Sequence, residues 1–342
     1  MKILVTANLV PFMTGGAEAH LEGLVHALRA NGHEVETLRL PFTFSPESDI
    51  ERLMEFVGQL DMNRPNGQQI DRVISLQFPG YGIHHHHHIV WLMHQHRAVY
   101  ELYDPATASP ELTRLRQSIH AYDTQALSQV HALFANSARV AERLLSFNGL
   151  RAKPLYHPPP QAEQFYCADA QDYIFFPSRL ERLKRQDLLI EAARHLQSPV
   201  VILLSGDGGQ RDAYQQQINR YRLQDRVRLL GRVDLRMKLT LYANALAVFF
   251  GPFDEDLGYV TLEAMLASKP VLTCTDSGGP LEFVVDGETG FITEPDPKAI
   301  AERIDWLHAH RAEAAAMGRA GRARWDALGI SWSHVVEQLL SA

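Results

Sequence analysis

The sequence predicts an α/β protein made of two doubly wound, Rossmann-like domains that face each other across a cleft. Short apolar runs alternate with longer helical patterns along almost the whole chain, which is typical of parallel sheets. The alternation stops once, at residues 155–161, where Tyr156-His157-Pro158-Pro159-Pro160 suits neither a helix nor a central strand. At 342 residues the chain is long enough for two cores. We therefore expect an N-terminal domain over residues 1–160 and a C-terminal domain over residues 161–330.

Composition narrows the class of protein. Hydrophobic residues make up 46% and charged residues 21% of the chain, and no apolar run approaches the ~20 residues that cross a bilayer. The formal net charge of -7 argues against non-specific binding of nucleic acid. Two cysteines, Cys167 and Cys274, suit a reducing compartment better than a disulfide framework. We expect a cytoplasmic protein that has no nucleic-acid partner.

The elements of the N-terminal domain begin with a strand at Ile3-Leu4-Val5, which we interpret as a strand rather than a signal peptide. A glycine turn at Thr14-Gly15-Gly16 follows, and then a helix with Leu21, Leu24, Val25 and Leu28 on one face, which Gly32 is placed to end. Further apolar runs predict strands at residues 73–76, 89–92 and 132–135.

The C-terminal domain repeats the pattern. Apolar runs predict strands at 173–176, 200–204, 247–250 and 270–273, and a helix is expected over 186–196. The final stretch, about 331–342, carries Trp332, Val335, Leu339 and Leu340 at helical spacing. We expect it to form a helix that packs back on the N-terminal domain.

Five consecutive histidines occupy residues 84–88. Consecutive side chains rarely converge on one ion with proper geometry. A tolerated loop run or an engineered tag is therefore favoured over a metal site.

The segment from Glu255 to Glu263 places two glutamates on either side of Gly258, which opens an apolar helical stretch. The N–H groups at the start of such a helix carry a partial positive charge that suits a diphosphate, and glycine lets the diphosphate approach closely. The flanking carboxylates would then take hydroxyl pairs, Glu255 from a sugar and Glu263 from a ribose. The alternative is a pair of solvated glutamates beside an ordinary helix.

A basic segment lies between a predicted strand and the next helix. Arg179 and Lys184 fall here, at the end of the sheet where doubly wound domains bind ligands. Departure of a nucleoside diphosphate requires its charge to be neutralised by a metal or by fixed cations, and these two side chains supply the latter. The alternative is a solvated basic loop.

The two segments in this order resemble family four of the glycosyltransferases, the "glycosyl transferases group one" proteins, which have the GT-B fold and retain anomeric configuration. Arg179 and Lys184 keep the family's five-residue offset, and the glutamates keep their spacing. The resemblance continues through residues 277–282 and 286–291. Two departures stand out: Asp256 follows Glu255 where the family usually has glycine, and the segment Gly206-Asp207-Gly208-Gly209 has a second glycine where proline is usual.

The N-terminal match is looser. Gly15 and Gly16 look like the family's first glycine loop, which lies against the donor diphosphate and the acceptor. In the family a histidine after a central strand points at the transferred sugar, and here His94 is favoured over His96. The resemblance thus implies catalytic roles for Arg179, Lys184, Glu255 and His94, and donor contacts from Gly15, Gly16, Arg179, Lys184, Glu255, Leu257, Gly258, Tyr259, Val260 and Glu263.

The resemblance implies a retaining hexosyltransferase that uses a nucleotide-sugar donor, needs no divalent metal or other cofactor, and serves envelope polysaccharide biosynthesis. We favour a UDP-sugar over a GDP-sugar, a glycan or lipid-linked acceptor, and peripheral contact with the inner membrane face. Three alternatives remain. Asp254-Glu255-Asp256 matches the Asp-x-Asp metal motif of another glycosyltransferase fold, and the strand-glycine-helix units suggest an oxidoreductase, although G-x-G-x-x-G is missing. The third is a catalytically silent GT-B protein that only binds nucleotide sugar.

Overall fold

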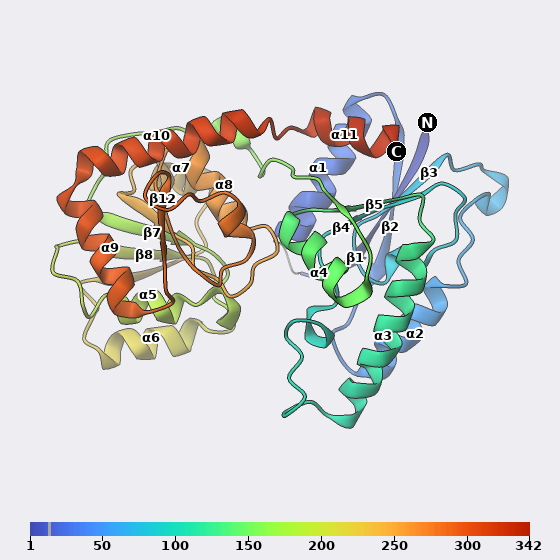
Figure 1. Cartoon of the computed structure of the whole chain (residues 1–342), viewed down its shortest axis with the longest axis horizontal. Helices are drawn as coiled ribbons and strands as arrows, with labels where there is room; N and C mark the ends of the chain where they lie inside the picture. Colours follow the sequence, from blue (N-terminus) through green and yellow to red (C-terminus); the bar gives the residue numbers. More distant parts are fainter. Residues whose placement is uncertain (13–14) are drawn as a thin grey trace. The chain divides into compact units, whose positions relative to one another are not determined.

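The computed structural model describes residues 1–12 and 15–342, and these form two compact units. The N-terminal unit comprises Met1–His157 and Ser331–Ala342, and the C-terminal unit comprises Pro158–Ile330 (Figure 1). Within the described residues each unit is built on a six-stranded sheet whose neighbouring strands are all parallel. Helices connect the strands, so the predicted α/β class with two Rossmann-like domains is confirmed.

The sheet of the N-terminal unit has the order β2-β1-β3-β4-β5-β6. Its strands are β1 (Lys2–Leu9), β2 (Glu34–Pro41), β3 (Arg72–Ser75), β4 (His88–Leu92), β5 (Ala132–Ala135) and β6 (Lys153–Pro154). Its helices are α1 (Gly16–Ala30), α2 (Glu47–Val57), α3 (Pro110–Ser128), α4 (Ala138–Asn148) and α11 (Trp332–Ser341), with short 3-10 turns at η1 (Pro65–Gly67), η2 (Gly80–Gly82) and η3 (Arg97–Val99).

Hydrophobic side chains cover both faces of this sheet, because neighbouring residues of a strand point to opposite faces. On β4, Trp91 packs with Leu24 and Leu28 of α1. Val90, one residue earlier, packs instead with Ile119 of α3. Each face is therefore closed by its own group of helices.

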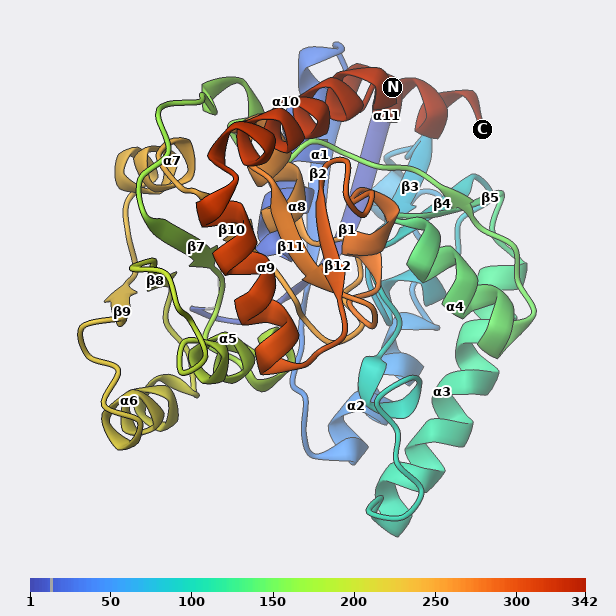
Figure 2. The same cartoon turned by 60° about the vertical axis from the view of Figure 1, so that its left-hand side comes forward.

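The sheet of the C-terminal unit has the order β12-β11-β10-β7-β8-β9. Its strands are β7 (Tyr173–Pro177), β8 (Val201–Ser205), β9 (Val227–Gly231), β10 (Ala247–Phe249), β11 (Val271–Cys274) and β12 (Gly290–Thr293). Its helices are α5 (Gln186–Ala192), α6 (Arg211–Arg220), α7 (Leu235–Ala243), α8 (Tyr259–Leu266), α9 (Pro297–Ala309) and α10 (Arg311–Leu328), with η4 (Ala162–Gln164), η5 (Arg182–Lys184) and η6 (Gly279–Glu282). Helix α5 contacts α6 and α9, and α8 contacts α10 (Figure 2).

Several predicted boundaries need correction. The helix expected over 186–196 ends at Ala192. Helix α1 ends where Gly32 was expected to end it: Asn31 is the C-cap, and Gly32 follows with a φ of +80° and donates to the Arg29 carbonyl. Residue Thr14 of the expected glycine turn lies outside the described residues. The strands expected at 200–204 and 270–273 each begin one residue later than predicted.

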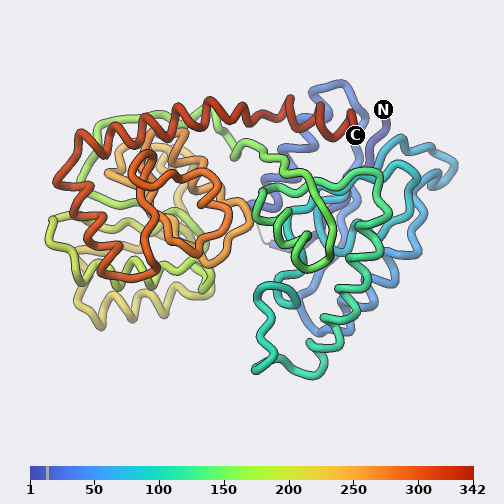
Figure 3. The backbone as a smooth tube through the Cα atoms, viewed as in Figure 1, coloured from blue at the N-terminus to red at the C-terminus, as the bar shows by residue number. Residues whose placement is uncertain are grey.

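Helix α11 completes the N-terminal unit. Val335 and Leu339 join the hydrophobic core on the α1 side of the sheet, and Trp332 lies against Gly23 of α1. A Cβ atom at Gly23 would lie 2.1 Å from the Trp332 ring, so only glycine allows this packing. The chain tube shows that both termini end in this unit (Figure 3).

None of the helices formed by residues 1–12 and 15–342 is long and apolar enough to cross a bilayer.

Candidate active site

Arg179 lies in the loop that follows β7, at the carboxyl end of the strand. Its backbone carbonyl accepts a hydrogen bond from the Gln186 side chain at 2.8 Å, which ties the loop to the start of α5. The Arg179 residue is exposed, and its guanidinium has no hydrogen-bond or ion-pair partner among the described residues. It is therefore available to bind an anion.

A glycine loop after β8 supports the Arg179 loop. A Cβ atom at Gly206 would lie 2.0 Å from the Ser178 carbonyl oxygen, and one at Gly208 would lie 2.5 Å from that of Leu180. Gly206 also has a φ of +132°, which side chains disfavour. The glycines at 206 and 208 thus allow two neighbouring loops to touch backbone to backbone.

Lys184 and Glu255 form an ion pair in the structure. The Lys184 Nζ lies 2.5 Å from the Glu255 Oε2, and each side chain is 16% exposed. Sequence analysis predicted both residues for the site, and the structure brings them together from segments 71 residues apart. Glu255 belongs to the Asp-x-Asp-like tripeptide, and here its carboxylate binds a lysine.

Arg185 connects three loops, and sequence analysis did not single it out. Its guanidinium binds both carboxylate oxygens of Asp276, at 2.8 and 2.6 Å, and donates to the carbonyls of Gly251 and Pro252. The residue has a left-handed backbone with a φ of 56°. The signal in the sequence was a fourth basic residue in the segment, directly after Lys184, and its contacts give it a structural role. It fixes the loops after β7, β10 and β11 relative to one another.

Two glycines hold the backbone of Glu255. Gly278 has a φ of +69°, and a Cβ atom there would lie 2.6 Å from the Glu255 carbonyl oxygen. At Gly279 a Cβ atom would lie 2.7 Å from the Asp256 carbonyl oxygen. The Gly279 N–H also donates to the Glu255 carbonyl at 2.8 Å. The Ser277-Gly278-Gly279 segment is therefore glycine-rich because it packs directly on the chain beside Glu255.

Helix α8 begins at Tyr259, directly after Gly258, whose φ is 83°. A Cβ atom at Gly258 would approach the Phe250 ring to 2.8 Å, so the sharp entry into the helix requires glycine. Leu257 and Val260 are buried on either side of this entry. The start of α8 carries the partial positive charge of a helix N-terminus, and it lies close in sequence to Glu255.

Glu263 lies inside α8 and is 3% exposed. One of its carboxylate oxygens accepts from the Lys238 Nζ and the other from the Tyr242 hydroxyl, both at 2.6 Å. Burial and this carboxylate raise the pKa of Tyr242 well above its ordinary value. Glu263 could be identified from its spacing to Glu255 and Gly258. Its partners Lys238 and Tyr242 could not, because they lie in α7 and only the fold brings that helix next to α8.

Two histidines after β4 have different surroundings. The His94 Nδ1 donates to the Gln95 carbonyl at 2.7 Å, and the ring is half-buried. The His96 ring packs against Phe42 and Phe78, and burial followed by the charge of His94 lowers its pKa to about 4. The His96 ring is therefore neutral at pH 7 and packed between aromatic rings, and the choice of His94 stays a prediction.

Gly15 and Gly16 mark the start of α1. Gly15 is its N-cap and Gly16 its first residue. Gly15 has an extended backbone with a φ of 178°, and a Cβ atom there would meet nothing within 4 Å. A contact of Gly15 and Gly16 with a ligand therefore stays a prediction.

Comparison with known families gives a match in the C-terminal unit. Residues 162–324 match the family model described as "Glycosyl transferases group 1". The chain is 38% identical to the alpha-1,3/1,6-mannosyltransferase ALG2 of Mus musculus over 102 residues, which is 30% of this chain and 24% of that protein. It is 26% identical to the D-inositol 3-phosphate glycosyltransferase of Mycolicibacterium smegmatis over 64% of this chain and 54% of that one. The chain thus spans only about a quarter to a half of these relatives.

Solved structures resemble the whole chain. The sucrose-phosphate synthase of Thermosynechococcus elongatus has a TM-score of 0.81 at 18% identity, and the match covers 99% of this chain and 97% of that one. Anabaena Alr3699/HepE, solved in complex with UDP-glucose, has a TM-score of 0.76 at 19% identity, covering 100% and 98%. At these identities the likeness establishes the fold.

Proposed function

Since residues 162–324 belong to the glycosyl transferases group 1 family and the chain has the GT-B fold, we propose that this protein is a retaining, metal-independent hexosyltransferase. It would move a hexose from a nucleotide-diphosphate sugar to a glycan or lipid-linked acceptor. The observation that carries the proposal is the exposed Arg179 guanidinium, which has no partner among the described residues, in the family-matched unit that also holds the Lys184–Glu255 pair.

Arg179 and Lys184 would neutralise the leaving diphosphate. A guanidinium binds two phosphate oxygens at once, and an ammonium adds a compact charge. The N-terminus of α8 contributes N–H groups for the same anion. Fixed charges of this kind stabilise a developing negative charge without reorganisation during the reaction. No divalent cation is then required for departure of the nucleotide.

Glu255 and Glu263 would divide the donor between them. Glu255 is partly exposed beside Lys184, so its free oxygen is placed to accept from hydroxyls of the transferred sugar. Glu263 would accept hydrogen bonds from the ribose hydroxyls. Its carboxylate oxygens already accept from Lys238 and Tyr242, so the ribose would either bind the same oxygens beside these side chains or displace them. His94 would contact the sugar through Nε2, since its Nδ1 is bound to the Gln95 carbonyl, and Gly15 and Gly16 would lie against the diphosphate and the acceptor.

The proposed stereochemistry is retention by attack from the same face. The acceptor hydroxyl would lose its proton to the departing phosphate oxygen as the glycosidic bond to the nucleotide breaks. We favour a UDP-sugar over a GDP-sugar, and the HepE complex with UDP-glucose supports a UDP donor. The acceptor would belong to a cell-envelope glycan made in the cytoplasm, with the protein at the inner membrane face.

A screen of nucleotide sugars tests the proposal. A ligand that binds only the folded state raises the apparent melting temperature. We expect UDP-glucose or a related UDP-hexose to raise the Tm of the full chain, and that donor to be cleaved to UDP on prolonged incubation with mixed glycan acceptors. NMR of the glycosylated product should show the anomeric configuration of the donor. Inverted product would exclude retention, and a Tm shift without any turnover would favour the silent binding protein.

A further inference from the structure

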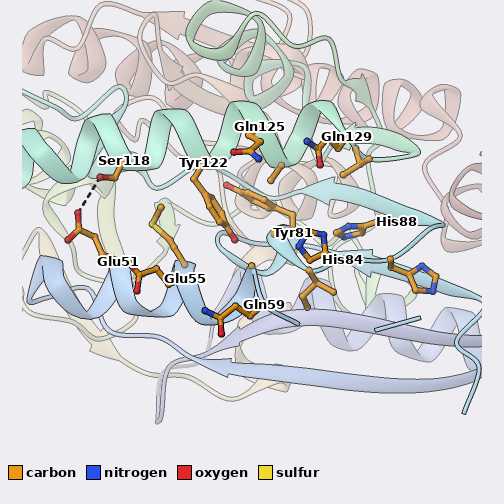
Figure 4. Close-up of a pocket in the computed structure, with 17 residues that line it drawn as sticks. Glu51, Glu55, Gln59, Tyr81, His84, His88, Ser118, Tyr122, Gln125 and Gln129 are labelled. Atoms are coloured by element: carbon orange, nitrogen blue, oxygen red, sulfur yellow. Dashed lines mark hydrogen bonds between the residues drawn. The ribbon is translucent and has the colours of Figure 1, made fainter. Parts of the chain in front are cut away.

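The N-terminal unit contains a pocket of about 630 Å³ between α2 and α3 (Figure 4). Its floor is formed by η2 and by the chain that leads into β4. Its volume lies within the roughly 300–1,000 Å³ of small-molecule sites. His88, which lines the pocket, begins β4, whereas His94 lies beyond the other end of that strand, about 20 Å away at ~3.3 Å per residue. The pocket is therefore separate from the histidine assigned to the transferred sugar.

The carboxylates of the pocket disfavour an anionic ligand. Glu51 and Glu55 of α2 line it, and no lysine or arginine occurs among the described residues of its wall. The Glu51 carboxylate accepts from the Ser118 hydroxyl of α3 at 3.3 Å (Figure 4). A phosphate or nucleotide would meet two carboxylates, with no lysine or arginine among the described lining residues to compensate them.

Carboxamides supply the other polar groups. Gln125 and Gln129 of α3 and Gln59 after α2 line the same space. Each carboxamide both donates and accepts hydrogen bonds, as each hydroxyl of a polyol does. Carboxylates alone would suit a cationic amine, but donors and acceptors together suit hydroxyl groups better.

The rest of the wall is apolar. Met54, Ile83, Ala126 and Val130 line it together with the Tyr122 ring, whose hydroxyl already donates to the Pro79 carbonyl. The C–H faces of a sugar ring pack on such surfaces while its hydroxyls bind at the rim. A lining that contains both apolar and carboxamide groups suits a sugar better than an ion, which would require polar groups alone.

Part of the histidine run belongs to this pocket. His84, His85 and His88 line it, while the His88 Nε2 lies 2.7 Å from the Ser75 hydroxyl and the His85 Nε2 donates to the Ile70 carbonyl. Burial lowers the pKa of His88 to about 4, so its ring is neutral at pH 7. No group of three or more His, Cys, Asp or Glu side chains in the described part of the chain is arranged to hold a metal ion. The histidines thus form one wall of a polar pocket.

We propose that the pocket between α2 and α3 binds a neutral saccharide of about two sugar residues. The site goes beyond the transfer reaction, because none of its lining residues belongs to the donor site described above. A glycan held there would be retained by the protein independently of the nucleotide sugar.

Saturation-transfer NMR on the full chain tests this proposal with maltose, cellobiose, α-1,3-mannobiose and N,N′-diacetylchitobiose, and with spermidine as a cationic comparator. Ala126→Phe places a ring in the pocket, and Ala121→Phe places the same ring on the exposed surface of α3 as its matched control. Gln125→Leu removes one carboxamide without filling the space. Thermal unfolding of each variant confirms that it is folded.

We expect at least one disaccharide to bind wild type and Ala121→Phe, to lose binding in Ala126→Phe, and to bind Gln125→Leu about fivefold more weakly. Disaccharide binding should persist in Arg179→Ala. The test of the pocket is therefore independent of the test of the proposed transfer reaction. Binding of none of the four disaccharides, or equal binding by Ala126→Phe and wild type, would overturn it. Spermidine binding that disappears in the Glu51→Gln, Glu55→Gln double variant, without disaccharide binding, would assign the pocket to a cation.

Discussion

Arg179 and Lys184, the two cations proposed to bind the leaving diphosphate, have different surroundings in the loop after β7. This difference predicts how replacing each one affects activity. The Arg179 side chain has no partner within residues 1–12 and 15–342, whereas Lys184 forms an ion pair with Glu255. Arg179→Ala and Lys184→Ala should each lower kcat about 100-fold or more, ~2.7 kcal/mol of transition-state stabilisation. Lys184→Ala should also weaken donor binding, because it leaves Glu255 beside the diphosphate without its counter-charge. Steady-state release of nucleotide measures both.

Arg182→Ala is the matched control for this pair. Arg182 is exposed and lies in η5 of the same loop, between the two proposed cations. Its removal should leave kcat within about twofold, since an exposed charge contributes little. Equal losses in the three variants would point to general electrostatic attraction and contradict specific roles for Arg179 and Lys184.

Comparing the binding of UDP and of the intact UDP-sugar distinguishes the proposed roles of Glu255 and Glu263. Both ligands carry the ribose, and the UDP-sugar alone carries the transferred sugar. Glu255→Ala should spare UDP binding and damage binding or turnover of the UDP-sugar, because only the donor carries the sugar. Glu263→Ala should weaken both ligands by roughly 1.5–3 kcal/mol if it binds ribose. It should also lower the Tm, because Lys238 and Tyr242 lose their shared partner. Calorimetry with UDP and intact donor separates the outcomes, and a normal UDP affinity in folded Glu263→Ala would reject the ribose role.

At the scale of elements, the loop after β11 depends on backbone contact with the loop after β10. Gly279→Ala would place a methyl group 2.7 Å from the Asp256 carbonyl oxygen and displace the chain beside Glu255. We expect loss of turnover and a lower Tm. Gly209→Ala is its control, since neither residue requires a positive φ and a Cβ at Gly209 meets nothing within 4 Å. Full activity in Gly279→Ala would show that this contact does not position Glu255.

Helix α3 carries a buried acid that makes stability depend on pH. Asp123 accepts from the hydroxyls of Tyr81 and Tyr100, yet burial raises its pKa from 3.8 to about 7. The folded state therefore holds this proton more tightly than the unfolded state, and the contribution to stability is lost as pH rises from about 4 to about 7. Asp123→Asn should flatten that slope in urea unfolding between pH 5 and 7.5. An unchanged slope would mean that Asp123 titrates as an ordinary carboxyl.

The inner strands could be predicted from the sequence, and the edge strands could not. Continuous apolar runs predicted β4, β5, β7 and β10, which are covered on both faces. Strand β2, with Glu34, Glu36 and Arg39 among its residues, lies at a sheet edge and has no such run. Strands β6, β9 and β12 are the other edges and were equally missed.

The site was predictable where spacing within one segment carried the information. Arg179 and Lys184 share a loop, and Glu255 and Glu263 share a helix start, so their offsets are visible in the sequence. The partners of these residues come from other elements: Lys238 and Tyr242 reach Glu263 from α7, and Asp276 reaches Arg185 from the loop after β11. Only the folding of the sheet brings these partners together.

At the scale of the whole molecule, each unit has its own sheet and helices, and the family match lies in the C-terminal unit. The C-terminal unit also holds the four proposed donor-binding residues whose roles the substitutions above test one by one: Arg179, Lys184, Glu255 and Glu263. Its charges alone are expected to support departure of the nucleotide. Metal independence is therefore the property of the whole protein that follows most directly from the proposed mechanism.

Turnover of the UDP-sugar identified by thermal shift, measured with and without EDTA, tests this central claim. The fixed cations and the start of α8 should replace a metal, so kcat should be unchanged in chelator and unaffected by added Mg²⁺ or Mn²⁺. Arg179→Ala should stay impaired under every metal condition. Loss of turnover in EDTA that Mg²⁺ or Mn²⁺ restores would contradict the account and would assign Asp254-Glu255-Asp256 to a metal.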